Sequence, residues 1–119
     1  MVEFKINKHT WRLYIVSPED LSIKGVHGYT DFAKHNIQIN SDLDETEIRS
    51  TITHEITHAY RWSYGFVNDA ENLKYAADEV EEMMANFIES FGDEIIEISK
   101  ELYKLIKKEI KLTKKSKKK

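Results

Sequence analysis

The feature that most constrains this chain is an amphipathic stretch after residue 44, in which apolar residues recur at helical spacing. Its apolar stripe consists of Ile48, Ile52, Ile56 and Ala59. A helix with such a stripe packs one face on a core and leaves the opposite face free for chemistry. Asp44 with Glu47 three residues on predicts a capping box at the start of this helix. Gly65 predicts that the helix ends near Trp62 or Ser63.

Before this helix, alternating apolar and polar residues predict three short strands. Residues 10–16 alternate Trp11, Leu13 and Ile15 with Arg12 and Tyr14, which is typical of a half-buried strand. The run H-G-Y-T-D-F-A followed by I-Q-I-N predicts two further strands, joined by a tight turn at 34–36. We expect these strands to form a small antiparallel sheet.

After Gly65 the periodicity predicts two more helices. The first covers about Asp69 to Phe91 and ends at Gly92, with an apolar stripe of Leu73, Val80, Met84, Phe87 and Phe91. The second begins near Asp93 or Glu94 and fades into the lysine-rich end of the chain. The predicted fold class is α+β, a three-stranded antiparallel sheet followed by three helices. We expect one domain over residues 1–112 and a flexible tail at 113–119.

Charge is distributed very unevenly along the chain. Residues 1–103 hold 9 Lys/Arg and 20 Asp/Glu, whereas residues 104–119 hold 9 Lys and one Glu. A terminal block of lysines is usually solvated, and it can also contact nucleic acid. Because no aromatic or arginine residues are interleaved with these lysines, a solubilising tail is the favoured interpretation and nucleic-acid contact the less favoured one.

Composition limits the chemistry that is available. The chain has 119 residues and no cysteine, so any metal site must use nitrogen and oxygen ligands. No apolar run reaches the length of a signal peptide core or of a membrane span. We therefore expect a soluble cytoplasmic monomer without membrane contact.

The motif T-H-E-I-T-H-A at residues 53–59 lies within the predicted amphipathic helix. Positions four apart lie on one face of a helix, so the imidazoles of His54 and His58 can converge on a single ion. Glu55 lies beside that ion without being forced to bind it, and its position suits a general base. The alternative is two surface histidines with no metal.

A catalytic zinc normally has three protein ligands and one open position, so a third ligand is required. Glu82 is the favoured candidate, because Asn86 one turn later shares its face and would accept the outer N–H of a ligand imidazole. Glu82 also lies roughly opposite the apolar stripe of its own helix, where a side chain is often simply solvated. Glu79 and Glu81 are the alternative third ligands.

The order G-x-T-D, I-x-I, T-x-x-H-E-x-x-H-A, Y-G and E-E-x-x-A-N-F resembles the minimal zincins, which comprise the ImmA/IrrE-like and related phage-encoded predicted metallopeptidases. The resemblance runs from about Trp11 to Ile95. It implies a gluzincin-type zinc metallopeptidase of phage or bacterial origin, with His54, His58 and Glu82 as zinc ligands and Glu55 as the general base. The chain lacks the F-A-x-x-L-L-x-P run that commonly follows in ImmA/IrrE-like proteins and reads F-I-E-S-F-G instead.

The expected function is zinc-dependent hydrolysis of peptide bonds in a peptide or protein substrate. The resemblance assigns guidance of an extended substrate to the strand around Tyr29–Phe32. His27, Tyr60 and Tyr64 are possible oxyanion donors, and the sequence does not choose among them. The alternative function is a zinc-binding but non-proteolytic regulatory or phage-associated module, with nucleic-acid contact through the lysine tail.

Overall fold

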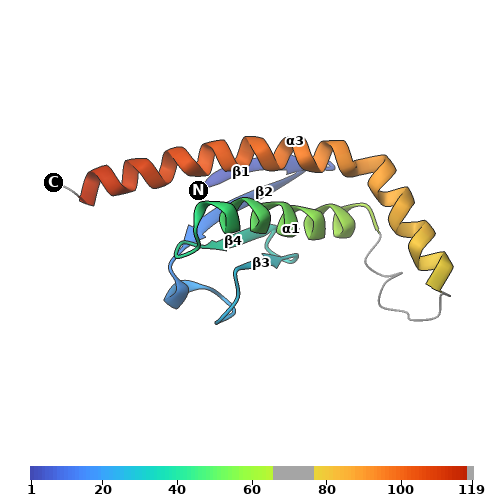
Figure 1. The fold of residues 1–119 in the computed structure, drawn as a ribbon, viewed down its shortest axis with the longest axis horizontal. Coiled ribbons are helices and arrows are strands. Elements are labelled where there is room, and N and C mark those ends of the chain that lie inside the picture. The colour runs from blue at the N-terminus through green and yellow to red at the C-terminus, as the bar shows by residue number, and fades with distance from the viewer. Residues whose placement is uncertain (66–76, 118–119) are drawn as a thin grey trace.

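The computed structural model describes residues 1–65 and 77–117. Its elements follow the chain in the order β1 (Val2–Ile6), β2 (His9–Val16), a short 3-10 helix η1 (Pro18–Asp20), β3 (Gly28–Asp31), β4 (Asn36–Asn40), α1 (Glu45–Ser63) and α3 (Ala77–Lys117). Figure 1 shows α3 as the longest element, running alongside α1 and the sheet and continuing past both. The class is α+β, but the predicted number of strands and their pairing are wrong, and the described residues form two α-helices, α1 and α3, in place of the three predicted.

The first strand, β1, is absent from the prediction. It forms an antiparallel hairpin with β2, in which Ile6 lies opposite His9. Asn7 and Lys8 form the two-residue turn, and both have positive φ values, of 47° and 71°. A type I′ hairpin turn requires positive φ at both of these positions. The stretch V-E-F-K-I does alternate, but its turn lacks the Asn-Gly or Asp-Gly pair that makes a hairpin easy to recognise.

The sheet is four-stranded and mixed, so the prediction of a three-stranded antiparallel sheet is wrong. The strand order is β1-β2-β4-β3. β3 pairs antiparallel with β4, as the predicted hairpin requires, but β4 pairs parallel with β2. The alternation of apolar residues identifies a strand without identifying its neighbour. Here β4 inserts next to β2, which leaves β3 at an edge of the sheet.

The core lies between the sheet and the two helices. The predicted stripe of α1 is buried as expected, with Ile52, Ile56 and Ala59 fully covered. Facing side chains come from β2, β4 and α3 and include Trp11, Leu13, Ile37, Ile39, Phe87, Ile95, Leu102 and Ile106. Burial on this scale is the main stabilising term for the fold, and it fixes how α1 is rotated relative to the sheet.

Residues 77–117 form a single helix, so the predicted break at Gly92 is wrong. Gly92 does not have the positive φ that ends a helix, whereas Gly65, with φ 82°, follows α1 where the prediction places a stop. The helix continues because its apolar stripe stays in phase across the glycine, from Phe87 to Ile95. The predicted start near Asp69 lies outside the described residues.

The C-terminal end of α3 lies beyond the predicted domain boundary at residue 112. The backbone of α3 is helical to Lys117 and so extends into the predicted tail. Among the helices of the described part of the chain, none combines the length and the apolar character needed to cross a bilayer.

Candidate metal centre

Helix α1 positions the motif residues, and its start is fixed by a capping box. The Asp44 carboxylate accepts a hydrogen bond from the backbone N–H of Glu47 at 2.8 Å, and the Glu47 side chain accepts one from the backbone N–H of Asp44 at 3.2 Å. The predicted capping box is confirmed. Because the helix start and its buried stripe are both fixed, the face that carries His54 and His58 is fixed as well.

The two imidazoles lie against each other. The Nε2 atoms of His54 and His58 are 3.2 Å apart, and the ring centroids are 4.8 Å apart with planes at 80°. His54 is exposed, whereas His58 is half-buried. Burial lowers the pKa of His58 below its usual range, and the charge of neighbouring Glu55 opposes this effect. The neutral imidazole that metals require is therefore favoured at neutral pH.

The separation of the two nitrogens matches a tetrahedral ion. Zinc binds histidine nitrogen at about 2.0–2.1 Å, which places two ligand nitrogens about 3.3–3.4 Å apart at a tetrahedral angle. The observed 3.2 Å is within a few tenths of an ångström of that value. The chemistry also fits, since two neutral imidazoles and a nearby carboxylate are the donors that zinc commonly takes in the absence of thiolates.

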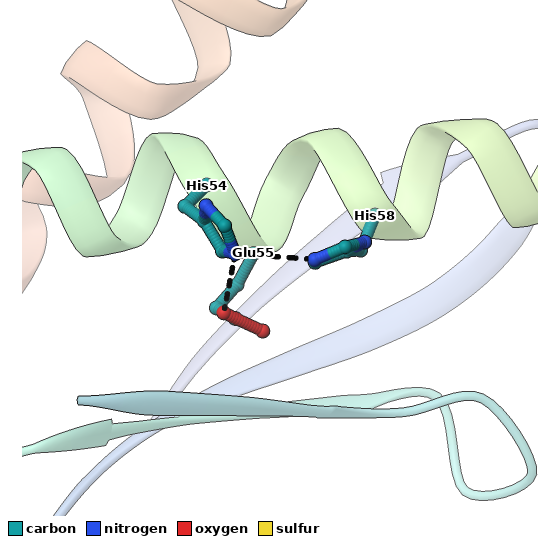
Figure 2. Close-up of side chains that lie close together, drawn as sticks. All are labelled: His54, Glu55 and His58. Atoms are coloured by element: carbon teal, nitrogen blue, oxygen red, sulfur yellow. Dashed lines mark hydrogen bonds and ion pairs between the residues drawn. The ribbon is translucent and has the colours of Figure 1, made fainter. Parts of the chain in front are cut away.

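Glu55 is buried beside the histidines and points towards the sheet, as Figure 2 shows. One carboxylate oxygen, Oε2, lies 3.9 Å from His54 Nε2. The other, Oε1, accepts a hydrogen bond of 2.8 Å from the Thr30 hydroxyl on β3. The 3.9 Å separation exceeds the spacing expected between two ligands of one tetrahedral zinc, so the carboxylate suits a proton-transfer role better than direct coordination.

Together His54, Glu55 and His58 form a group whose possible ligand atoms all lie within 4.8 Å of one another. The residues that the structure describes contain no second group of this kind. The histidine pair and its neighbouring carboxylate therefore converge as predicted, and the group could hold a metal ion.

Close packing of β3 against α1 depends on Gly28. A Cβ atom at this position would lie 2.7 Å from Thr51 Cγ2, 3.0 Å from Glu55 Cγ and 3.2 Å from the Gln38 carbonyl oxygen. Only glycine lets the strand approach the helix this closely without displacing a neighbour. The same approach brings the Thr30 hydroxyl within reach of the Glu55 carboxylate.

A cavity of about 490 Å³ opens next to the motif. Its lining consists of Val26, His27, Gly28, Ser50, Thr51, His54 and Glu55. The cavity thus combines one histidine of the pair, the buried carboxylate and the start of the edge strand β3. Its size is within the range of sites that hold small molecules or a few residues of a peptide.

Of the three possible oxyanion donors, His27 lines this cavity and is exposed. Tyr60 is buried instead and packs on Phe91 of α3, with ring centroids 6.0 Å apart. Tyr64 stacks on Tyr60 and also contacts Phe91. The two tyrosines therefore help to join α1 to α3 and do not line the cavity.

The structure does not bring the predicted third ligand to the histidines. Glu82 lies in the first part of α3, is exposed, and is not a member of the group around His54 and His58. Asn86 and the alternatives Glu79 and Glu81 are exposed as well. In Figure 1 this part of α3 bends away beyond the end of α1. The identity of the third ligand stays a prediction.

The sequence predicts a substrate-guiding strand around Tyr29–Phe32, which includes Thr30, but it predicts neither the contact of Thr30 with Glu55 nor the close packing at Gly28. Residues two apart on a strand lie on one face, so Gly28 and Thr30 both face α1 once one of them does. That alternation was the available signal, but it does not say which helix covers the strand. The contact with Glu55 is a tertiary feature.

Comparison with known proteins adds no relative to these observations, since no family model, no curated protein and no solved structure matches this chain. The resemblance to minimal zincins consequently rests on the residues of the motifs alone. What the structure adds is the convergence of His54, Glu55 and His58.

Proposed function

We propose that this protein is a zinc-dependent peptidase that uses His54 and His58 as metal ligands and Glu55 as its general base. The observation that carries the proposal is the 3.2 Å separation of the two Nε2 atoms, with the buried Glu55 carboxylate 3.9 Å from one of them. The four-residue spacing alone would bring two surface histidines together, so what supports a metal centre is the buried carboxylate beside the pair, held by the Thr30 hydroxyl. The adjoining cavity supplies room for a substrate.

Zinc bound at the histidines would lower the pKa of a bound water to about 7 and polarise the scissile carbonyl. Glu55 would accept the proton from the attacking water and pass it to the departing amine. Thr30 holds one oxygen of this carboxylate through its hydroxyl, which leaves the other oxygen towards the histidines. Burial keeps bulk water from competing for the same carboxylate.

The edge strand β3 is the proposed guide for the substrate. It pairs with β4 on one side only, and its first residue, Gly28, lines the cavity. An extended peptide can add to such an edge through backbone hydrogen bonds. A peptide bound along β3 would pass close to the Glu55 carboxylate, because Thr30 of the same strand contacts it.

Glu82 remains the proposed third ligand, with Asn86 as its companion and Glu79 or Glu81 as alternatives. Its binding would require the first part of α3 to approach α1. In a zinc competition titration, Glu82→Gln should weaken binding far more than Glu79→Gln or Glu81→Gln. The reverse ranking would assign the third ligand to another glutamate while leaving the histidine pair intact.

The function itself is tested by cleavage of an unfolded protein such as casein by the zinc-loaded chain. Glu55→Gln keeps the shape of the side chain and removes the base, so turnover should fall at least about 100-fold while zinc binding stays within a few-fold of wild type. Stoichiometric zinc without cleavage by the wild-type chain would contradict the peptidase proposal. That result would favour the non-proteolytic zinc-binding module.

A further inference from the structure

A second, smaller cavity lies between α1 and α3 and shares no lining residue with the metal centre. Its volume is about 140 Å³, and its lining consists of Arg49, Thr53, Ile96, Ser99, Lys100 and Tyr103. At about 30 Å³ per water molecule, it has room for four or five waters, or for an ion of similar size. Two of its six lining residues are cationic, and none is acidic.

Neither cation of this cavity forms an ion pair within 4 Å in the part of the chain that the structure describes, although the charge of Glu45 acts on Arg49. The Arg49 guanidinium lies 5.2 Å from the centroid of the Tyr103 ring and makes no ion pair. Glu45, one helical turn before Arg49, already binds the Tyr103 hydroxyl and the Lys107 ammonium. Lys100 has no ion-pair partner among the same residues.

One residue that lines the cavity, Ser99, has a buried hydroxyl without a partner in the described part of the chain. Ser99 is 5% exposed, and its Oγ makes no hydrogen bond within the described part of the chain. A buried hydroxyl without a hydrogen bond costs free energy, so such groups ordinarily have a partner in the protein or in ordered water, and a bound ion can take that place. Thr53 adds a second hydroxyl, which donates to the Arg49 carbonyl oxygen and can still accept.

We propose that this cavity is a binding site for a phosphate-type oxyanion. The guanidinium of Arg49 and the ammonium of Lys100 would supply charge-assisted hydrogen bonds, and the Ser99 hydroxyl would supply a neutral one. The planar, fork-like guanidinium is well suited to two oxygens of one phosphate. The proposal is independent of the zinc site, since it involves no residue of that site.

The phosphate has two possible sources, a free ion or a phosphate group in a nucleic-acid backbone. Lys104 and Lys111 are exposed on α3 beyond Lys100, at spacings of four and eleven residues. These spacings place them near one face of the helix, so positive charge continues from the cavity towards the C-terminus. Such a continuation would suit a polymer with regularly spaced phosphates.

The test is a titration of the full-length, isotope-labelled chain with sodium phosphate, followed by NMR in the presence of a chelator that keeps phosphate from binding to a metal. Sodium chloride at matched ionic strength serves as the reference. We expect saturable shifts at the amides of Arg49, Ser99 and Lys100. Arg49→Gln and Lys100→Gln should each weaken binding about tenfold or more.

Lys108→Gln is the matched control, because it removes the same charge from an exposed residue of α3 that does not line the cavity. It should leave phosphate affinity within about twofold of wild type. Ser99→Ala should weaken phosphate binding without changing net charge. Far-ultraviolet circular dichroism of each variant verifies that the helices are retained.

A short single-stranded oligonucleotide then distinguishes the two sources. If it displaces phosphate and also loses affinity in Arg49→Gln, the site holds a nucleic-acid phosphate; if phosphate saturates and the oligonucleotide does not compete, the site holds a free ion. Phosphate shifts that do not saturate, or that chloride reproduces, would overturn the proposal. An equal loss in Lys108→Gln and Lys100→Gln would overturn it as well.

Discussion

Helix α1 and the first part of α3 are both amphipathic, yet only α1 has its apolar stripe covered. Ile52 and Ile56 of α1 are 0% exposed, whereas on the stripe of α3 Val80 and Met84 are 40% and 64% exposed and burial begins only at Phe87. Covering a stripe fixes the rotation of a helix, and so fixes where the opposite face points. This explains why His54 and His58 are firmly placed, whereas packing does not determine the position of Glu82.

The two helices also differ in what the sequence can say about their functional residues. The histidine pair is a local feature, because residues four apart on a helix meet whatever the rest of the chain does. A ligand from a second helix is a tertiary feature, and it depends on how that helix is packed. Substitutions at Gly28, Tyr60 and Gly92 test how tightly the chain is packed at the metal centre, between α1 and α3, and within α3.

Gly28→Ala should have the largest effect on stability at neutral pH. The added Cβ would lie 2.7 Å from Thr51 Cγ2 and 3.0 Å from Glu55 Cγ, so either β3 or α1 must move. Overpacking of this kind costs about 1–3 kcal/mol, and urea unfolding of the variant measures the loss. A loss below about 0.5 kcal/mol would show that β3 lies farther from α1 than these distances indicate.

The second prediction concerns the joint between the helices, where Tyr60 of α1 packs on Phe91. Burial, together with the charge of Glu94, raises the pKa of Tyr60 from 10.0 to about 12. Between these two values the unfolded chain loses the phenolic proton while the folded chain keeps it, so stability should fall as pH rises from 10 to 12. The two-unit shift corresponds to about 2–3 kcal/mol.

Tyr60→Phe isolates this contribution, because other groups also titrate above pH 10. Urea unfolding of the wild type and the variant, compared at pH 9 and pH 12, gives the difference that belongs to Tyr60. The wild type should lose more stability than the variant over this range. Equal losses would mean that the hydroxyl titrates normally and that the joint is open to solvent.

Gly92→Ala should have the smallest effect, and of the opposite sign. Gly92 lies within α3, where alanine is favoured over glycine by about 0.8–1.0 kcal/mol. The added Cβ would lie 3.3 Å from Ile88 Cγ2, and Ile88 is exposed and free to move by a few tenths of an ångström. We expect a net gain below about 1 kcal/mol, measured by thermal unfolding.

A marked loss of stability in Gly92→Ala would contradict the description of α3 as one continuous helix. It would instead restore the predicted break at this residue. Gly28→Ala and Gly92→Ala make the same chemical change, so their comparison separates close packing at the site from helix propensity in α3.

Much of the local structure could be predicted from the sequence, because its signals are local. The capping box of Asp44, the stripe of α1, the hairpin of β3 and β4 and the stop near Gly65 each depend on residues close together in the chain. The parallel pairing of β2 with β4 could not be predicted, since apolar alternation carries no information about the neighbouring strand.

At the metal centre, too, local features could be predicted from the sequence and tertiary contacts could not. The convergence of His54 and His58 follows from their four-residue spacing on a helix, whereas the place of Glu55 beside them also depends on β3. The hydrogen bond from Thr30 to Glu55 spans 25 residues of sequence and depends on the edge position of β3. The continuation of α3 through Gly92 depends on apolar residues on both sides that share one core, which outweighs the weak helix propensity of one glycine.

Zinc competition titration of the purified chain against a chelator of known affinity tests whether His54 and His58 bind one zinc ion together. We expect one zinc per wild-type chain and a loss of affinity greater than about 100-fold in either His54→Ala or His58→Ala, more than the 10- to 100-fold typical of removing an outer-shell partner. Retention of wild-type stoichiometry and affinity in both variants would contradict this expectation.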